Sequence, residues 1–300
     1  MVSPMKFNLH DLLAADRFVV TAEVSPPKGS DCGEFMEKAR ALRGTVDAIN
    51  VTDNQGANMR ISPLAPAALL AGEGIEPILQ LTCRDRNRLA LQSDLLAAAT
   101  FGVTNVLALT GDYITFGDHA GAKPVFDLDA VQLLQTIAAL NSGRDLAGTT
   151  LHGVPAFFPG AAAAPEAEPF ELTLVKLRKK AAAGARFFQT QALFSPEKLV
   201  RFMEAVRPLG VKVIAGVILL KSAGMARYMN ARIPGLTVPQ ELIAELDDAE
   251  RPLEAGVAIA RRLVAAFRPH CDGIHIMAMG KEALIPEILA DLHRSDGSEG

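Results

Sequence analysis

The sequence predicts a (β/α)8 barrel, an α/β fold in which eight parallel strands alternate with helices. Three observations predict it. Eight apolar runs of strand length recur along the 300 residues, and each ends in a polar cluster. Stretches with helical spacing follow these runs, which indicates a parallel sheet covered on both faces. The chain is also long enough for such a barrel, which typically needs about 250 residues.

The apolar runs define the expected strands. They lie at residues 18–23, 48–52, 77–82, 106–110, 151–158, 187–191, 212–219 and 273–279. In a parallel barrel, catalytic side chains lie at the C-terminal ends of the strands and in the loops that follow. The strand ends are therefore where functional residues are expected.

Helices between these strands are predicted by their spacing and by capping residues. The expected segments are residues 62–71, 87–101, 127–141, 170–183 and 196–206. Asn87 is a suitable N-cap, Ser195 precedes a proline at a first helical turn, and Gly184 is a suitable C-cap.

Two segments interrupt the alternation. Residues 159–169 (PGAAAAPEAEP) are small and rich in proline, which predicts a long loop after the fifth strand. Residues 222–268 supply extra chain between the seventh and eighth strands, enough for two or three helices. We expect one barrel domain over residues 1–294 and a flexible tail at 295–300.

Composition excludes several classes of protein. The net charge is −4 with no basic stripe, which argues against a nucleic-acid partner. No apolar stretch approaches the roughly 20 residues of a membrane span. The three cysteines are far apart, so neither a disulfide framework nor a metal site is expected. Residues 1–17 indicate a short amphipathic helix instead of a signal peptide, and we expect a cytoplasmic protein.

Glu23 is the most informative single residue. It lies in an otherwise apolar first strand, where a carboxyl group must either be paired or be kept protonated by burial. The plain alternative is a structural pair with a nearby cation such as Lys28. An acid in a barrel strand just before its loop favours the functional interpretation.

Polar groups also close the second, third, fourth and sixth strands. They include Thr52, Gln80, the Thr110-Gly111-Asp112 turn, and the pair Gln189 and Gln191. Taken singly, each could be a turn residue or a solvated group. The two glutamines alternate onto one side of their strand, next to two phenylalanines, and buried amides need partners. A polar heterocycle would supply such partners.

Together, these strand ends resemble the methylenetetrahydrofolate reductase family. The matching pieces fall in family order from about residue 18 to 292, and the ordered set is far more specific than any one of them. They are residues 22–29 (AEVSPPKG), 50–53 (NVTD), 80–83 (QLTC), 108–112 (ALTGD), Lys180 with 183–185 (AGA), 190–191 (TQ) and 273–277 (GIHIM). Residues 82–96 and 213–230 most resemble the branch found in acetogens and related organisms.

The resemblance implies a flavin, usually FAD, at the barrel mouth, and reduction of 5,10-methylenetetrahydrofolate to 5-methyltetrahydrofolate. By matching positions, Glu23 and Asp112 are the catalytic pair, with Glu23 as general acid. The same two residues, with Gln191 and Lys281, are expected to bind the folate. The flavin-shell positions are Thr52, Gln80, Thr110, Gly111, Asp112, Phe126, Asp127, Lys179 and Lys180.

Departures from the enterobacterial pattern leave alternatives open. Gln80 stands where a histidine is common, Thr110 where an arginine is common, and no phenylalanine is found near Ala223. FMN in place of FAD, or no flavin, therefore stays open. The electron source also stays open: it is either NAD(P)H or an electron-delivering partner subunit. Whether the chain forms a homo-oligomer stays open as well.

Other functions compete with this one. One is a flavin-free pterin reductase that takes hydride from a nicotinamide or a deazaflavin. Another is a Schiff-base aldolase, which requires a desolvated lysine at a strand end. A third is a non-catalytic folate-binding subunit of a larger complex.

Overall fold

Eight parallel strands close into a barrel in chain order. The structure is a computed structural model that describes residues 8–233 and 235–295. The strands are β1 (Val19–Val24), β2 (Ala48–Val51), β3 (Pro77–Thr82), β4 (Asn105–Leu109), β5 (Phe158–Ala163), β6 (Phe187–Ala192), β7 (Lys212–Ile218) and β8 (Gly273–Met277). Each pairs with the next, and β8 pairs with β1. The predicted (β/α)8 fold is confirmed.

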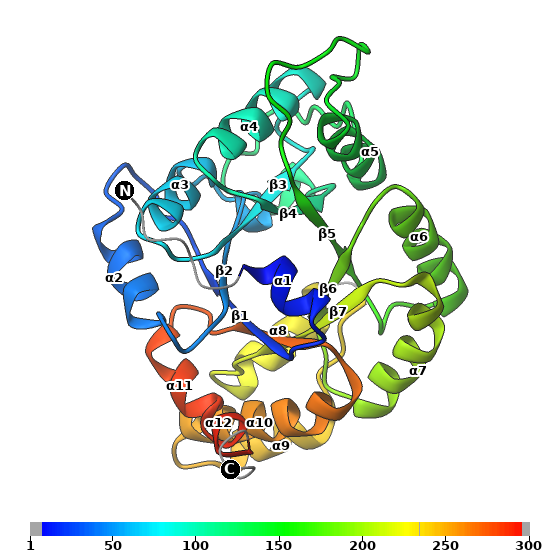
Figure 1. Cartoon of the computed structure of the whole chain (residues 1–300). Coiled ribbons are helices and arrows are strands. Elements are labelled where there is room, and N and C mark those ends of the chain that lie inside the picture. Colours follow the sequence, from blue (N-terminus) through cyan, green and yellow to red (C-terminus); the bar gives the residue numbers. More distant parts are fainter. Residues whose placement is uncertain (1–7, 234, 296–300) are drawn as a thin grey trace.

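The helices surround the ring of strands, except the first, which lies at its centre in the view of Figure 1. They are α1 (Leu9–Ala14), α2 (Gly33–Ala41), α3 (Leu64–Gly72), α4 (Arg88–Thr100), α5 (Ala130–Asn141), α6 (Phe170–Ala182), α7 (Pro196–Val206), α8 (Ala223–Arg232), α9 (Gln240–Asp248), α10 (Pro252–Phe267), α11 (Ile285–Ile288) and α12 (Ala290–Ser295). The extra helices predicted between the last two strands are α8, α9 and α10. None of the helices in the described part of the chain is both long and apolar enough to cross a membrane.

Capping side chains define several helix starts. Asn87 accepts hydrogen bonds from the backbone N–H groups of Leu89 and Ala90, and Ser195 caps α7, as predicted. The fifth helix begins later than the predicted residue 127, because Asp129 forms a capping box with Gln132. Asp127 is thereby left outside the helix, free for another contact.

The predicted fifth strand is misplaced. Residues 151–157 are not a strand, and the predicted loop at 159–169 begins with β5. The Asn141 side chain bonds both the N–H and the C=O of Phe157 at 2.9 Å, which occupies the groups that a strand would offer to its neighbours. Glycine is required in β5, because a Cβ at Gly160 would lie 2.3 Å from Phe187 Cζ. Alanines and a glycine form this strand because their small size lets them fit beside a phenylalanine, although neither residue type favours strands by itself.

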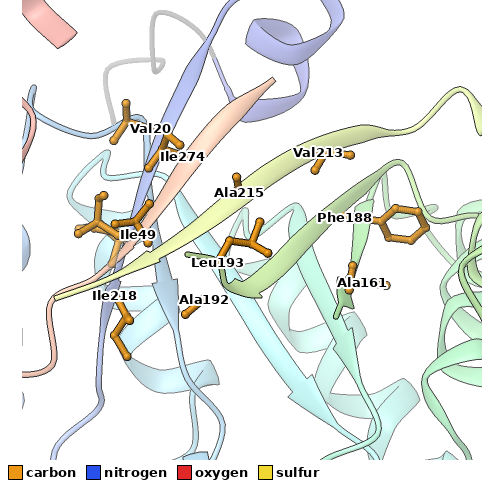
Figure 2. Packing of buried hydrophobic residues seen from close by; sticks show 14 of the residues in the cluster. Val20, Ile49, Ala161, Phe188, Ala192, Leu193, Val213, Ala215, Ile218 and Ile274 are labelled. Carbon is orange, nitrogen blue, oxygen red and sulfur yellow. The ribbon is translucent and has the colours of Figure 1, made fainter. Parts of the chain in front are cut away.

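A large apolar cluster packs the outer faces of the strands against the helices. Figure 2 shows part of it, including Val20 of β1, Ala215 of β7 and Ile274 of β8. A second cluster fills the N-terminal end of the barrel. There Leu9, Leu12 and Leu13 of α1 pack against the first inward side chains of the strands, and Figure 1 shows α1 at the centre of the ring.

The inward side chains change from apolar to polar along the barrel axis. Val19 belongs to the apolar floor, and side chains alternate along a strand, so Thr21 and Glu23 point to the same interior side. The C-terminal end of the barrel is therefore the polar end. The predicted helix at residues 1–17 is described from residue 8 onward, and in that part α1 spans Leu9–Ala14. Residues 1–7 and the tail at 296–300 lie outside the described residues.

Candidate active site at the barrel mouth

Glu23 lies near the C-terminal end of β1, opposite Asn50 of β2. Its side chain is buried, with 8% of the residue exposed. Burial raises the pKa of Glu23 to about 7, the amide of Gln55 opposes this rise, and the charge of Glu282 adds to it. A carboxylic acid that stays protonated close to neutral pH is suited to donating a proton.

The structural alternative for Glu23 was an ion pair with Lys28. Lys28 instead pairs with Asp118, in the loop after β4. Asp118 also accepts hydrogen bonds from the backbone N–H of Met59, at 3.0 Å, and from His119. Within the described residues, Glu23 forms no salt bridge, so its environment favours the neutral acid.

Below Glu23, a polar layer crosses the barrel interior. Thr21 Oγ1 lies 2.9 Å from Nδ1 of His275, and Asn50 Nδ2 lies 3.4 Å from the same nitrogen. The Gln80 amide donates to Asn50 Oδ1 at 3.3 Å. Burial lowers the pKa of His275 to about 3, so its ring is neutral. Two buried atoms of this layer, Gln189 Oε1 and His275 Nε2, have no hydrogen-bond partner in the protein.

Glu23 opens onto a cavity of about 470 Å³ beside the mouth. Two kinds of side chain line it. The polar and charged ones come from β1, α2, the segment after β2 and the segment after β8, and they include Glu23, Glu34, Lys38, Thr52, Gln55, Asn58, Arg60 and Glu282. The apolar ones include Pro26, Pro27, Phe35 and Met279. A cavity of this size with a buried acid in its wall is suited to binding a small molecule.

Asp112 follows the end of β4 by three residues, and its side chain lies in the same region. Its Oδ2 accepts a hydrogen bond from the backbone N–H of Gly56, at 3.1 Å. Gly56 belongs to the short 3-10 helix η1 (Gln55–Ala57), and Gln55 is the amide beside Glu23. The two predicted catalytic carboxyl groups therefore contact consecutive residues of one turn.

Thr110 and Gly111 have clear structural tasks. Thr110 Oγ1 accepts the N–H of Ala130 at 3.2 Å and so anchors the start of α5. Gly111 has φ +99°, and a Cβ there would lie 2.8 Å from Arg84 Cβ. Arg84 is itself buried and paired with Asp85. The glycine allows the ends of β3 and β4 to approach each other closely.

Phe126 and Asp127 lie at the end of the loop after β4. Phe126 adopts φ +41°, and its ring centroid is 6.4 Å from that of Tyr113. Asp127 forms a bidentate pair with Arg88, at 2.9 and 3.0 Å. These hydrogen bonds lower the pKa of Asp127 to about 2. Asp127 is thus an anion whose charge Arg88 already balances.

Lys180 and Gln191 share a smaller cavity of about 260 Å³ between β5 and α6. Lys180 Nζ donates to the carbonyl of Ala162 at 2.6 Å. Burial lowers the pKa of Lys180 to about 8, and the charge of Lys176 adds to this effect. Lys179, one residue earlier on α6, is exposed, and Lys281 is exposed in the loop after β8.

The predicted site residues therefore fall into two groups. Glu23 and Asp112 contact η1, and Thr52 lines the same cavity as Glu23, while Lys180 and Gln191 lie beside β5. Sequence reasoning did not identify Gln55 and Glu282 as site residues. Glu282 follows the eighth strand by a few residues, which is where a search of strand ends could have found it. Gln55 closes the polar run of residues 52–55 after the second strand, so the same search would have found it, although only the turn at η1 brings its amide beside Glu23.

No three His, Cys, Asp or Glu side chains in the described portion of the chain come together in a way that could hold a metal ion.

Comparisons with known proteins identify the family of the chain. A family model described as methylenetetrahydrofolate reductase matches residues 8–293. The methylenetetrahydrofolate reductase 2 of Schizosaccharomyces pombe is 28% identical over 239 residues, which are 72% of this chain and 35% of the yeast protein. The chain thus spans about a third of that relative. The 5,10-methylenetetrahydrofolate reductase of Escherichia coli is 24% identical over 255 residues, 82% of this chain and 80% of the bacterial protein.

Among solved structures, oxaloacetate acetylhydrolase superposes with a TM-score of 0.53 at 13% identity, covering 98% of this chain and 88% of that one. This likeness concerns the barrel fold alone. The family model covers nearly the whole chain, and the mouth carries an acid at the end of its first strand. The chain belongs to the methylenetetrahydrofolate reductase family.

Proposed function

We propose that this protein reduces 5,10-methylenetetrahydrofolate to 5-methyltetrahydrofolate, with a bound flavin as the hydride source. The observation that carries the proposal is Glu23, a buried acid with a pKa near 7 in the wall of a cavity at the barrel mouth. Membership of the family supports the substrate.

Glu23 is proposed as the general acid. Opening the methylene bridge leaves a reactive iminium only if the departing nitrogen receives a proton. A carboxylic acid donates best when its pKa is near the working pH, and burial places Glu23 there. The cavity wall would hold the pterin with its nitrogen toward this carboxyl group.

Asp112, Gln191 and Lys281 are proposed to orient the folate. The hydrogen bond from Gly56 holds the Asp112 carboxylate beside the turn that also carries Gln55. Gln191 is exposed at the end of β6 and keeps its amide available. Lys281 is exposed and cationic next to the first cavity, which suits the carboxylates of a folate.

Polar atoms in the barrel interior, below the mouth, support the proposal of a bound flavin. A flavin ring offers donors and acceptors along its pyrimidine edge, and Gln189 Oε1 and His275 Nε2 are buried atoms that lack partners. A bound reduced flavin supplies hydride, and the protein supplies orientation and electrostatics. Thr52, Gln80, Thr110, Gly111, Asp112 and Phe126 would form its surroundings. Asp127, Lys179 and Lys180 would lie at its rim, with Lys180 the partly buried lysine of the two.

Spectroscopy and a product assay together test the proposal. The purified chain, with FAD or FMN added, should retain a yellow chromophore through gel filtration. After anaerobic reduction it should convert methylenetetrahydrofolate to methyltetrahydrofolate. A chain that retained neither flavin and formed no product would contradict the proposal. A chain that retained no flavin, yet formed product with a reduced nicotinamide, would overturn the flavin part alone.

A further inference from the structure

Glu282 is a second buried carboxyl group in the cavity that contains Glu23. It begins the 3-10 helix η5 (Glu282–Leu284), just after β8, and only 6% of the residue is exposed. Its Oε1 accepts the backbone N–H of Gly280 at 3.0 Å. Both Glu23 and Glu282 line the 470 Å³ cavity, Glu23 from β1 and Glu282 from the segment after β8, the strand that pairs with β1.

A lysine partly balances Glu282. Lys38 Nζ of α2 lies 3.5 Å from Glu282 Oε2, and this oxygen has no hydrogen bond of good geometry. The same ammonium lies closer to Glu34, at 2.8 Å, whose side chain is 81% exposed. One cation is therefore divided between two carboxylates, and the buried one keeps the weaker contact.

Glu23 has a neutral partner instead: the amide of Gln55 lies beside it, and within the described residues it forms no ion pair. The titratable groups that line the cavity are Glu23, Glu34, Lys38, Arg60 and Glu282. Of these, Lys38 is committed to the other two carboxylates, and Arg60 is exposed. When two carboxyl groups share a poorly solvated site and one has the better ionic partners, that one ionises and the other retains its proton.

We propose that Glu282 is a positioning residue for Glu23: its buried negative charge, held by Lys38 and the Gly280 N–H, keeps the neighbouring acid in its proton-carrying form. The inference rests on the proposed function, because it gives Glu23 a donor's role. The charge of Glu282 is one of the causes that raise the pKa of Glu23, after burial itself. Glu282 does not touch the reacting atoms and acts only through Glu23.

The direct test is an NMR titration of Glu23. The full chain, labelled with 13C in its glutamate carboxyl groups, is titrated in the wild type and in Glu282→Gln. The signal of Glu23 is assigned by its loss in Glu23→Gln. A neutral amide at 282 can still accept the Gly280 N–H but removes the charge. The midpoint of Glu23 should therefore fall by a few tenths to about one pH unit.

Two further variants separate charge from structure. Glu282→Asp keeps the charge and should leave the midpoint of Glu23 close to its wild-type value. If Glu282→Gln does not fold, Glu282→Met, which also removes the charge, takes its place. Glu287→Gln removes an exposed carboxylate of α11 that does not line the cavity, and it should leave the midpoint unchanged. If Glu282→Gln shifted Glu23 no more than Glu287→Gln does, the inference would be overturned.

The titration needs no substrate turnover, so its outcome is independent of the proposed function. If the chain also reduces methylenetetrahydrofolate, the alkaline limb of its kcat/KM profile should move to lower pH in Glu282→Gln by the same amount. A midpoint that moved without any activity in the wild type would refute the function and leave the coupling between the two carboxyl groups intact.

Discussion

Two buried glutamates at opposite ends of the barrel show how differently one residue type can be used. Glu76 lies at the N-terminal end, just before β3, with 5% of the residue exposed. Its Oε1 accepts the Asn105 amide at 2.6 Å and the N–H of Leu9 at 3.4 Å. Glu23 lies at the mouth and is buried to a similar extent, but it lines a cavity and has the amide of Gln55 beside it.

Burial raises the pKa of both groups. The difference lies in what their oxygens contact. The hydrogen bonds of Glu76 connect α1 and β4 at the floor of the barrel, so this carboxyl group stabilises the fold. Glu23 keeps its proton next to open space, where a ligand can receive it. A perturbed acid therefore indicates function when it lines a cavity that a ligand can enter, and not when its hydrogen bonds join elements of the fold.

The largest expected effect that follows from this contrast is on catalysis. Glu23→Gln should lower kcat/KM for methylenetetrahydrofolate reduction by about 10²–10⁴-fold, because an amide cannot donate the required proton. In the wild type, kcat/KM should fall about tenfold per pH unit above pH 7, as Glu23 ionises. Steady-state assays across pH measure both. Full activity in Glu23→Gln would remove the residue from the mechanism.

At the floor, the largest expected effect is on stability. Leu13 of α1 is 1% exposed within the apolar cluster that closes the barrel. Leu13→Ala should lower the free energy of unfolding by about 2–5 kcal/mol, through lost burial and a residual cavity. Urea denaturation measures this change, and kcat should be unaffected at temperatures where the variant is folded. A clear fall in kcat at those temperatures would mean that packing at the N-terminal end of the barrel affects the active site at the C-terminal end.

The buried acid at the mouth should also cost stability at alkaline pH. Folding raises the pKa of Glu23 from 4.5 to about 7, so between these values the folded state binds more protons than the unfolded state. The contribution to stability is present below pH 4.5 and is lost as pH rises to 7. Glu23→Gln lacks this loss, and at pH 8 it should be more stable than the wild type by about 3 kcal/mol, relative to their difference at pH 4.5. Denaturation at the two pH values tests the sign.

The smallest effect is expected at Glu76. Glu76→Ala leaves the Leu9 N–H without its acceptor, while the Asn105 amide keeps its bond to the Pro77 carbonyl at 3.0 Å. We expect a loss of about 1–3 kcal/mol in the free energy of unfolding. Hydrogen exchange should locate the loosening in α1, with kcat unchanged. If activity fell as far as in Glu23→Gln, the division between structural and functional acid would not hold.

Much of the architecture could be predicted from local patterns. Seven strands lie within two residues of their predicted bounds, because continuous apolar runs of that length suit a sheet buried on both faces. Asn87 and Ser195 cap their helices for equally local reasons. The fifth strand could not be predicted, since Pro159, Gly160 and the alanines after it resemble a loop until Phe187 is placed beside them.

The sequence by itself determined the barrel, the order of its strands and the presence of an acid at the end of the first one. Only the tertiary structure decided the surroundings of that acid. Lys28, four residues after the strand, pairs with Asp118, while Glu282, some 260 residues from Glu23 in the chain, lies in the same cavity. The reason is that closing the ring makes β8 the neighbour of β1. Electrostatic interactions depend on distance in space and on burial, and neither can be read from separation along the chain.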